Sequence, residues 1–444
     1  MSGTVVMKFG GTSVGDAERI KRAARRIVAA REQGRRVVAV LSARGKTTDE
    51  LIAMAEEVST APDPREMDML LSTGERISCA LCAMAINDLG HRAISLTGSQ
   101  AGIVTDTSHT KARILDVRAD RIRDALYDDL IVLVAGFQGV STSKDVTTLG
   151  RGGSDTTAVA LAAAIDAEVC EIYTDVAGVF SADPRIVPDA RKLPVVSFEE
   201  MLEMSASGAG VLQLRSVEYA RNHGIRIHCR SSFTESPGTF VVGEEETMER
   251  PLITAVTHSR DEARITLLGV PDHPGVAGRI FTALADANVN VDMIIQNEPE
   301  SEGAAADMSF TVPRSDLRVA RATLDPVVAQ VGIKAVAEDP EMGKVSVVGA
   351  GMKSHPGVAA RVFSTLGDQG INIEMISTSP IKISCVVTAD MVDRAVRALH
   401  EAFELGADQI EAEHPFGTSR VTTPTGSTQD AEGGTAMRSR GASL

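Results

Sequence analysis

Residues 4–13 read TVVMKFGGTS, a short apolar run that ends in two glycines. An almost continuous apolar run of this length is typical of a strand buried on both faces of a parallel sheet. Glycines directly after such a strand let backbone N–H groups approach a phosphate, because no Cβ stands in the way. Lys8, within the run, supplies a mobile cation to the same place. The stretch predicts a phosphate site at a sheet edge, with a simple tight turn as the competing interpretation.

The next segments alternate between helix and strand patterns. One set of apolar residues has the spacing of a helix face: Ile20, Ala23, Ala24, Ile27 and Val28. Apolar strands are predicted at 37–43, 131–137 and 169–175, and helices at about 66–89 and 154–165. Ser197 and Glu200 have the spacing of a capping box, so a further helix begins there. The alternation predicts an α/β domain over residues 1–245, with a mostly parallel sheet covered on both faces.

An internal repeat follows this domain. HPGVA occurs at 273–277 and again at 355–359, and the same register aligns Asn290 with Asn372. Each copy is predicted to form a strand, a turn, an amphipathic helix and a second strand, at 288–294 and 371–376. Two small α+β modules are therefore expected at 263–340 and 341–413, after a polar linker at 246–262. The Gly-, Ser- and Thr-rich residues 414–444 are expected to be disordered.

Composition limits the classes of function. Lys and Arg total 45 and Asp and Glu total 60, so the net charge is −15, which argues against general nucleic-acid binding. We found no apolar run of about 18 residues, so no membrane-spanning helix is expected and a cytoplasmic protein is inferred. Cys79 and Cys82 form a C-x-x-C within a helical pattern. We interpret them as buried helix cysteines, with redox or metal chemistry as the alternative.

A second glycine-rich loop, TTLGRGGSDTTA, lies at 147–158. A loop of this kind before a helix N-terminus forms an anion cradle. Arg151 offers a planar fork suited to a carboxylate. Asp155 either takes part in the chemistry or is a cap residue favoured by the helix dipole.

A third segment, YTDVAGVFSADPR at 173–185, follows a predicted strand. Ligands of open α/β sheets usually bind beyond the carboxyl ends of the strands, which is where Thr174 and Asp175 lie. Pro184 restricts Asp183 to an extended backbone, which suits a loop around a flat ligand. Arg185 is a candidate phosphate contact.

A fourth motif combines two segments, SARGKTTDE at 42–50 and STGERIS at 72–78. Ser42 ends a strand, and Lys46, Thr47 and Asp49 are expected in the next loop. Glu75 falls in a helical stretch, where a solvated surface carboxylate is the competing interpretation. The Walker A pattern, the dinucleotide fingerprint and the protein-kinase motifs are all absent from the sequence.

Taken together and in this order, the motifs resemble those of the aspartate kinases, in the amino-acid kinase fold family. The repeated modules resemble ACT domains, which bind amino acids as effectors. The resemblance covers about residues 4–410 and is strongest to the actinobacterial type. It implies a mostly parallel sheet sandwiched by helices, followed by two ferredoxin-like ACT modules. The implied reaction is ATP plus L-aspartate giving 4-phospho-L-aspartate and ADP, with Mg²⁺ bound through the nucleotide and no protein metal site.

The resemblance assigns site residues by type. Lys8 and Asp155 are the expected catalytic pair. The expected ATP contacts are Lys8, Phe9, Gly10, Gly11, Ser42, Thr174, Asp175, Val179, Phe180, Asp183, Pro184 and Arg185. Glu75 is expected to take the substrate ammonium and Arg151 its α-carboxylate. The other expected substrate contacts are Thr47, Gly152, Gly153 and Ser154.

The resemblance also implies feedback regulation by lysine, threonine or both, and a homo-oligomer or an assembly formed through the ACT modules. Loops before two helices are expected to receive an effector carboxylate. The expected regulatory residues are Asp272, His273, Gly275, Val276, Asn290, Gln296, His355, Gly357, Asn372 and Ile373. No nucleic-acid or membrane partner is expected.

Four positions depart from the family pattern. Gly210 stands where relatives usually carry a lysine that contacts ATP, and Arg44 stands where they usually carry Met. We hypothesise that Arg44 or Lys46 supplies the replacement charge. Ala177 replaces a frequent Asp, and Pro380 replaces a Glu and removes a backbone N–H.

Two other functions stay open from the sequence. One is a kinase of the same fold that acts on glutamate or acetylglutamate. The other is a catalytically weak amino-acid sensor, for which the change at Gly210 is the motive.

Overall fold

The computed structural model describes residues 3–246, 251–297 and 305–406. The expected tail at 414–444 lies outside the described residues. So do residues 247–250 of the expected linker and 407–413 of the expected second module.

An eight-stranded sheet forms the centre of the N-terminal part, in the order β10-β12-β11-β9-β1-β2-β6-β3. Its strands are β1 (Thr4–Phe9), β2 (Arg36–Leu41), β3 (Ala93–Leu96), β6 (Ile131–Ala135), β9 (Val169–Thr174), β10 (Val195–Ser197), β11 (Ile227–Ser231) and β12 (Thr239–Val242). All run parallel except β12 and β10 at one edge. β1 lies between β2 and β9, so the chain moves outward to both sides of it. Open α/β sheets bind ligands beyond the carboxyl ends of the strands at such a switch point.

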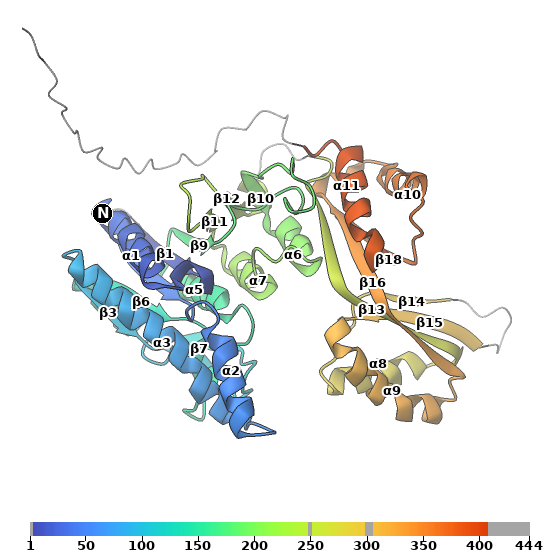
Figure 1. Ribbon diagram of the computed structural model, residues 1–444, viewed down its shortest axis with the longest axis horizontal. Coiled ribbons are helices and arrows are strands. Elements are labelled where there is room, and N and C mark those ends of the chain that lie inside the picture. The colour runs from blue at the N-terminus through green and yellow to red at the C-terminus, as the bar shows by residue number, and fades with distance from the viewer. Residues whose placement is uncertain (1–2, 247–250, 298–304, 407–444) are drawn as a thin grey trace, which may run out of the picture. The chain divides into compact units, whose positions relative to one another are not determined.

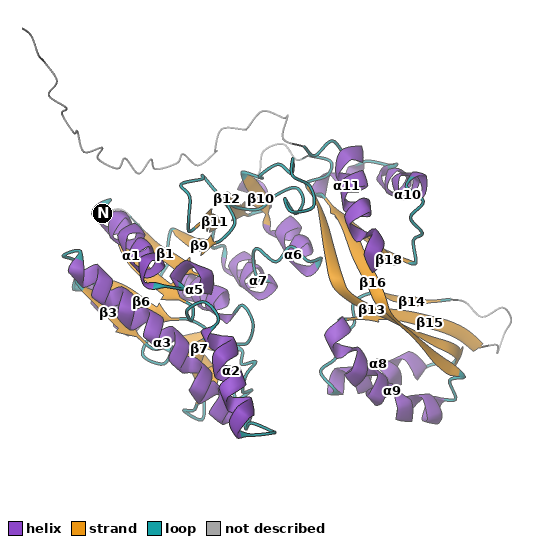
Figure 2. Cartoon of the chain, in the orientation of Figure 1, coloured by secondary structure: helices purple, strands orange, loops and turns teal. Residues whose placement is uncertain are grey.

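Helices cover both faces of this sheet (Figures 1 and 2). α1 (Ala17–Glu32) and α3 (Pro64–Asp88) pack on one face. The other face carries α4 (Asp120–Tyr127), α5 (Gly153–Ala164), α6 (Phe198–Ala206) and α7 (Leu214–His223). The five residues predicted to form the apolar face of α1 are all buried. The capping box at the start of α6 has both of its hydrogen bonds. The predicted α/β architecture is confirmed.

The C-x-x-C pair lies in the core of α3. Cys79 and Cys82 are free and buried against α1, and burial raises the pKa of the Cys82 thiol to about 12. Among the described residues, α3 alone is long and apolar enough to pass a test for a membrane span, which core helices of soluble proteins also pass. No group of three potential metal ligands occurs in the described part of the chain. The interpretation as buried helix cysteines is confirmed.

Several short elements escaped prediction. A four-stranded sheet, in the order β5-β4-β7-β8, comprises β4 (Ile103–Thr105), β5 (Ile114–Val117), β7 (Gln138–Ser141) and β8 (Val146–Thr148). α2 (Thr47–Val58) begins in the segment expected to be a loop. The loop prediction for Thr47 and Asp49 was therefore wrong, and Lys46 is the N-cap residue. The helix lacks a periodic apolar face, since Leu51 is its only buried residue.

The C-terminal part is built on a six-stranded antiparallel sheet, in the order β14-β15-β13-β16-β18-β17. Its strands are β13 (Ala255–Pro271), β14 (Ile294–Gln296), β15 (Ala305–Val312), β16 (Ala335–Val348), β17 (Met375–Ser379) and β18 (Lys382–Thr388). Its helices are α8 (Val276–Asp286), α9 (Leu317–Val331), α10 (Val358–Asp368) and α11 (Val392–Ala402). β14 and β17 begin near the ends of the segments predicted as second strands, because the residues before them are not paired.

The two repeats exchange strands within this sheet. The first half of β13, 255–259, pairs with the second half of β16, 344–348. The second half of β13 pairs with the first half of β16. Each repeat therefore has four strands, and one of the second repeat's strands comes from residues expected to be linker. Within this segment Val256 is buried in the core of the second repeat and Ala255 in the core beside α6, and these two adjacent residues are too few to form a recognisable strand pattern.

One buried carboxylate joins α6 to the repeats. Glu200 Oε1 accepts a hydrogen bond from Thr254 Oγ1 at 2.6 Å and another from the Ala350 N–H at 3.1 Å. Its Oε2 accepts from Ser197 within the capping box. The side chain thus satisfies donors from the segment that follows β16, from the segment before β13 and from the N-cap of its own helix.

We predict that Glu200→Ala lowers the midpoint of the first thermal unfolding transition by roughly 10 °C. The change removes the buried acceptor of Thr254 and of the Ala350 N–H as well as that of Ser197, and a buried donor left unpaired costs ~1–3 kcal/mol. Calorimetry measures this. Glu218→Ala, at an exposed site on α7, is the control and leaves the midpoint unchanged. Equal midpoints for the two variants would contradict the role given to Glu200.

Candidate functional site

The side chains of Lys8 and Asp155 meet beyond the carboxyl end of β1. Lys8 Nζ lies 2.5 Å from Asp155 Oδ1, and the two side chains are only 11% and 12% exposed. Alternation along β1 turns Val6 and Lys8 toward the face covered by α5, while Met7 and Phe9 enter the opposite core. Asp155 lies in the first turn of α5, where the helix dipole favours a negative charge. One positive and one negative group are therefore held together at this edge, largely sheltered from water.

Glycines bring the loops after β1 and β2 against each other. A Cβ on Gly11 would lie 2.9 Å from the Ala43 carbonyl oxygen, so only glycine fits there. The Gly45 N–H donates to the Gly11 carbonyl oxygen at 3.0 Å, and the Gly10 N–H to the Tyr173 carbonyl oxygen at 3.3 Å. Phe9 stacks on Tyr173 in the core, with ring centroids 4.8 Å apart. Phe9 therefore offers only its backbone to a ligand at this edge.

The second glycine-rich loop turns sharply into α5. Gly150 and Gly152 have φ of 76° and 73°, a left-handed conformation that favours glycine. Arg151 between them is exposed, and its carbonyl oxygen accepts from Gln213 Nε2 at 3.0 Å. Ser154 is buried against Gly136. Gln213 supports the loop although the sequence analysis did not single it out, because a lone glutamine carries no recognisable motif.

Glu75 is not the solvated residue of the competing interpretation. It is 3% exposed, and its Oε1 accepts from the Ala43 N–H at 3.2 Å. Its Oε2 is buried and lacks a hydrogen-bond partner among the described residues. Burial raises the pKa of the Glu75 carboxyl to about 7, against 4.5 in water. Such a carboxylate is stabilised by any cation that reaches Oε2.

The segment 173–185 supplies fewer side chains than expected. Thr174 Oγ1 donates to Asp175 Oδ1 at 3.1 Å beyond the end of β9. The Val179 side chain is buried in the core, its N–H donates to Thr239 Oγ1 and its carbonyl oxygen accepts from the Leu193 N–H at 2.8 Å, so all of its groups already have partners within the chain. Phe180 packs beside the core of the second repeat.

Asp183 and Arg185 contact each other within this segment. Arg185 Nε and an Nη donate to the two oxygens of Asp183 at 3.0 and 2.7 Å. These hydrogen bonds hold the pKa of the Asp183 carboxyl below its usual value. Pro184 lies between the two residues, and the guanidinium of Arg185 is 89% exposed. To bind a phosphate, the Arg185 guanidinium must therefore either break its hydrogen bonds to Asp183 or use its remaining N–H groups while keeping them.

The positions that depart from the family pattern are all at least partly accessible to solvent. A Cβ on Gly210 would meet no atom within 4 Å. Arg44 is half-buried, and one Nη donates to the Gly15 carbonyl oxygen at 3.4 Å, in the loop that follows Gly11. Lys46 is exposed, and Ala177 is half-buried. Pro380 occupies an exposed turn between β17 and β18.

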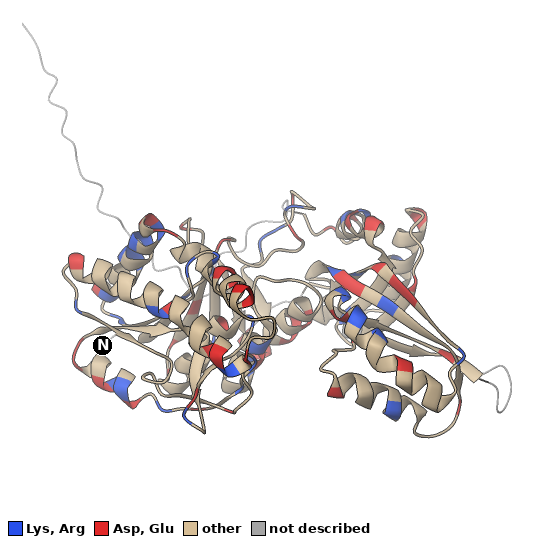
Figure 3. Cartoon of the chain, turned by 60° about the horizontal axis from the view of Figure 1, so that its bottom comes forward, with Lys and Arg blue, Asp and Glu red and all other residues tan. Residues whose placement is uncertain are grey.

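The regulatory candidates lie around two matching helix starts. Gly275 and Gly357, with φ of 94° and 96°, precede α8 and α10. Asn372 Nδ2 donates to Glu374 Oε1 at 2.7 Å. Gln296 ends β14. The remaining candidates occupy these loops, the helix starts or the segments that follow the helices: Asp272, His273, Val276, Asn290, His355 and Ile373. Figure 3 shows acidic and basic residues interspersed over the helices and strands of both parts of the chain.

Comparisons with known proteins match this organisation. The model of the amino acid kinase family matches residues 3–231, and ACT domain models match 264–327 and 345–403. The aspartokinase of Mycolicibacterium smegmatis is 57% identical over 94% of this chain and 99% of its own length. The aspartokinase of Corynebacterium glutamicum is 54% identical over the same shares.

Solved structures agree with the sequence relatives. Escherichia coli aspartokinase III in complex with aspartate and ADP is 26% identical with a TM-score of 0.77, covering 90% of this chain and 99% of that one. The same enzyme in complex with lysine and aspartate gives a TM-score of 0.71, covering 90% and 100%. Sequence identity above 50% over nearly the full length and a shared fold lead to one conclusion. The chain belongs to the amino acid kinase family and is one of its aspartokinases.

Proposed function

We propose that the enzyme transfers the γ-phosphoryl group of ATP to the side-chain carboxylate of L-aspartate in the cytoplasm, giving 4-phospho-L-aspartate and ADP. The observation that carries the proposal is Glu75, a buried carboxylate with one oxygen that has no hydrogen-bond partner in the described part of the chain. A free amino acid has the ammonium group that such an oxygen needs. The related enzyme from Escherichia coli was solved with aspartate and ADP, which supports the same pair of ligands here.

The charges suit a reaction between two anions. A carboxylate that attacks a phosphoryl group needs alignment and neutralisation of charge more than a covalent intermediate. Lys8 is proposed to screen the transferring phosphoryl group, and Asp155 fixes the position of its ammonium. Arg151 is proposed to take the α-carboxylate of aspartate, with Thr47, Gly152, Gly153 and Ser154 lining the same place. Each preorganised contact of this kind is worth ~3–4 kcal/mol in the transition state.

The nucleotide is proposed to lie over the ends of β1 and β9. Backbone groups of Gly10 and Gly11, Ser42 and the residues from Thr174 to Arg185 would contact it. Asp155 already pairs with Lys8, and Asp175 already accepts from Thr174. These carboxylates are therefore poor candidates for a protein metal site, and Mg²⁺ would be bound through the phosphates of ATP. The ion would neutralise charge on the phosphates as they react.

A coupled assay of ADP release tests the proposal. Turnover with aspartate, but not with glutamate or N-acetylglutamate, is the expected result. Turnover with one of the other two acids would assign a different kinase of this fold. No turnover with any of the three would favour a sensor.

We also propose that lysine and threonine regulate the enzyme through the ACT modules, and that these modules assemble with those of a second chain. A lysine-bound structure of the Escherichia coli relative supports an amino-acid effector. The edge strands β14 and β17 carry Ile294 and Ile376, which match in the repeat and are 50% and 40% exposed. Apolar side chains on exposed sheet edges favour pairing with another chain.

The raised pKa of Glu75 predicts a pH dependence for aspartate binding. Below pH 7 the carboxyl is largely protonated and attracts the substrate ammonium poorly, so the KM for aspartate falls as pH rises from 6 to 8. Glu75→Gln abolishes this slope and raises the KM at pH 8 by about 100-fold, the value of a buried charged contact. Steady-state kinetics measure both effects. Glu66→Gln, exposed on the same helix, is the control.

The same group predicts a change in stability without substrate. Its pKa is higher in the folded state than the 4.5 of the unfolded chain, so stability falls as pH rises from about 4.5 to 7. Glu75→Gln removes this loss, and the substrate-free variant is more stable at pH 8 by up to about 3 kcal/mol. Denaturation in urea at pH 8 that shows a less stable variant would contradict the burial of an unpaired charge.

The hypothesis of a replacement cation predicts opposite effects at two positions. Arg44→Met raises the KM for ATP about tenfold, and Gly210→Lys lowers it, because the new side chain has open space. Arg36→Met, at an exposed site on β2, is the control. Unchanged kcat and ATP KM in Arg44→Met would rule out compensation by Arg44.

Regulation is predicted to be concerted. Lysine and threonine together should inhibit ADP release more strongly than the product of their separate effects. Activity that stays constant with both effectors present would exclude this regulation, and a monomer in sedimentation would exclude the proposed assembly.

A further inference from the structure

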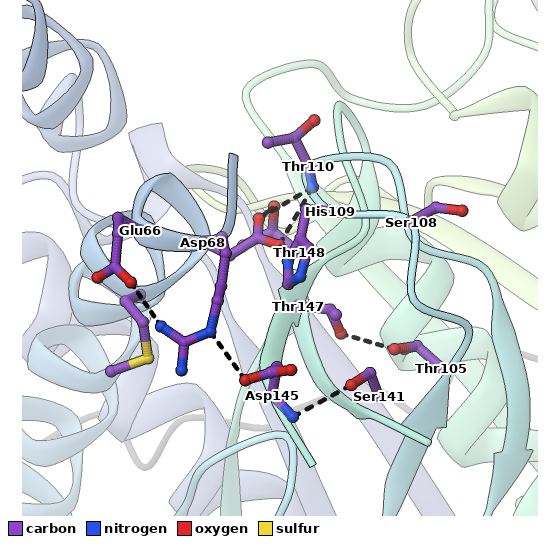
Figure 4. Close-up of polar contacts among 12 residues, drawn as sticks. Glu66, Asp68, Thr105, Ser108, His109, Thr110, Ser141, Asp145, Thr147 and Thr148 are labelled. Atoms are coloured by element: carbon purple, nitrogen blue, oxygen red, sulfur yellow. Dashed lines mark hydrogen bonds and ion pairs between the residues drawn. The ribbon is translucent and has the colours of Figure 1, made fainter. Parts of the chain in front are cut away.

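Helix α3 carries a second buried carboxylate, that of Asp68, which lies outside the proposed substrate and nucleotide contacts. Asp68 lies seven residues before Glu75, two turns earlier on the same helix, and is 0% exposed. Figure 4 shows it surrounded by residues from two other segments, the loop before β5 and the end of β8. Burying a carboxylate costs free energy unless hydrogen-bond donors surround it, so the partners of Asp68 determine whether it can remain charged there.

Four hydrogen bonds from the described residues reach the two oxygens of Asp68. Its Oδ1 accepts from Thr148 Oγ1 at 2.5 Å, and its Oδ2 from His109 Nδ1 at 2.6 Å. The Thr110 N–H donates to both oxygens at 3.1 Å. A carboxylate only accepts, so His109 carries its proton on Nδ1 in this arrangement. The four hydrogen bonds join three separate segments of the chain at one point.

These segments support the loop that carries Arg151. Thr148 is three residues before Arg151, and its carbonyl oxygen accepts from the Ala112 N–H at 2.9 Å. Thr110 has φ of 66°, which is strained for a β-branched residue and is held by its bonds to Asp68. A Cβ on Gly150 would lie 3.1 Å from the Thr110 carbonyl oxygen, so the glycine turn packs directly on this residue.

We propose that Asp68 is a positioning residue for aspartate binding, one that fixes the Arg151 loop relative to Glu75. This rests on the proposed function, in which Arg151 takes the α-carboxylate and Glu75 the ammonium of aspartate. Both groups sit on one carbon of the substrate, so their protein partners must keep a fixed separation. One rigid helix provides it, because Glu75 lies on α3 directly and Asp68 ties the loop to the same helix.

The neighbouring threonines of β8 offer a matched test. Thr147 and Thr148 are both 0% exposed, but Thr147 Oγ1 bonds to Thr105 Oγ1 at 2.6 Å and not to Asp68 (Figure 4). Valine preserves the shape of threonine and removes the hydroxyl, while serine keeps the hydroxyl. We expect Thr148→Val to raise the KM for aspartate about tenfold with the KM for ATP unchanged, which is the loss of one hydrogen bond to a charged group. Thr148→Ser and Thr147→Val should keep both KM values.

Asp68→Asn is expected to have a larger effect, a rise in the KM for aspartate of about 100-fold. Thr148→Val remains the test if Asp68→Asn does not fold. Hydrogen exchange of the amides at 149–153 is measured on the same proteins without substrate. Faster exchange there in Thr148→Val, but not in Thr147→Val, is the expected result and shows that Asp68 fixes the loop, independently of which acid the enzyme phosphorylates. Equal effects of the two valine variants on aspartate KM and on exchange would overturn it, as would a parallel rise in the KM for ATP.

Discussion

The contact between Lys8 and Asp155 is the interaction on which the site depends. A chain with a net charge of −15 must bring a polyanionic nucleotide to a carboxylate, so each cation has to be held in place. The parallel sheet makes this possible, because it ends β1, β2 and β9 at one edge and sets the N-terminus of α5 beside them. Asp155 keeps the ammonium of Lys8 at that edge, where solvent is largely excluded.

A second constraint comes from the junction between the sheet domain and the repeats. Glu203 on α6 pairs with Lys382 at 2.8 Å and accepts from Ser379 at 3.2 Å, one turn after Glu200 makes its own contacts. The segment that follows α6 leads to Gln213, which holds the Arg151 loop. α6 therefore contacts the second repeat, and the segment after α6 supports the Arg151 loop, so a continuous stretch of chain connects the second repeat with that loop.

The sequence predicted the elements whose apolar spacing is regular, such as β1, α1 and α3, and the glycine loops that chemistry requires. It did not predict α2, whose buried face is a single leucine, or the exchange of strands between the repeats, which depends on pairs such as Ala255 with Val348 that lie far apart in the chain. Lys8 and Asp155 were proposed as site residues from the family resemblance. Their contact could be seen only in the structure, because the two residues lie far apart in the sequence. The burial of Glu75 and the hydrogen bonds of Asp68 had no local signal, because both carboxylates are buried by segments distant in the chain.

A double-mutant cycle on Lys8 and Asp155 tests the central claim, that the two residues act as one unit. The measured quantity is kcat for Lys8→Met, for Asp155→Asn and for the double variant, with saturating substrates. The account predicts a loss of at least ~100-fold in each single variant and almost no further loss in the double variant, because either change disables the same cation. Losses that multiply in the double variant would show that the two side chains act independently and would contradict the account.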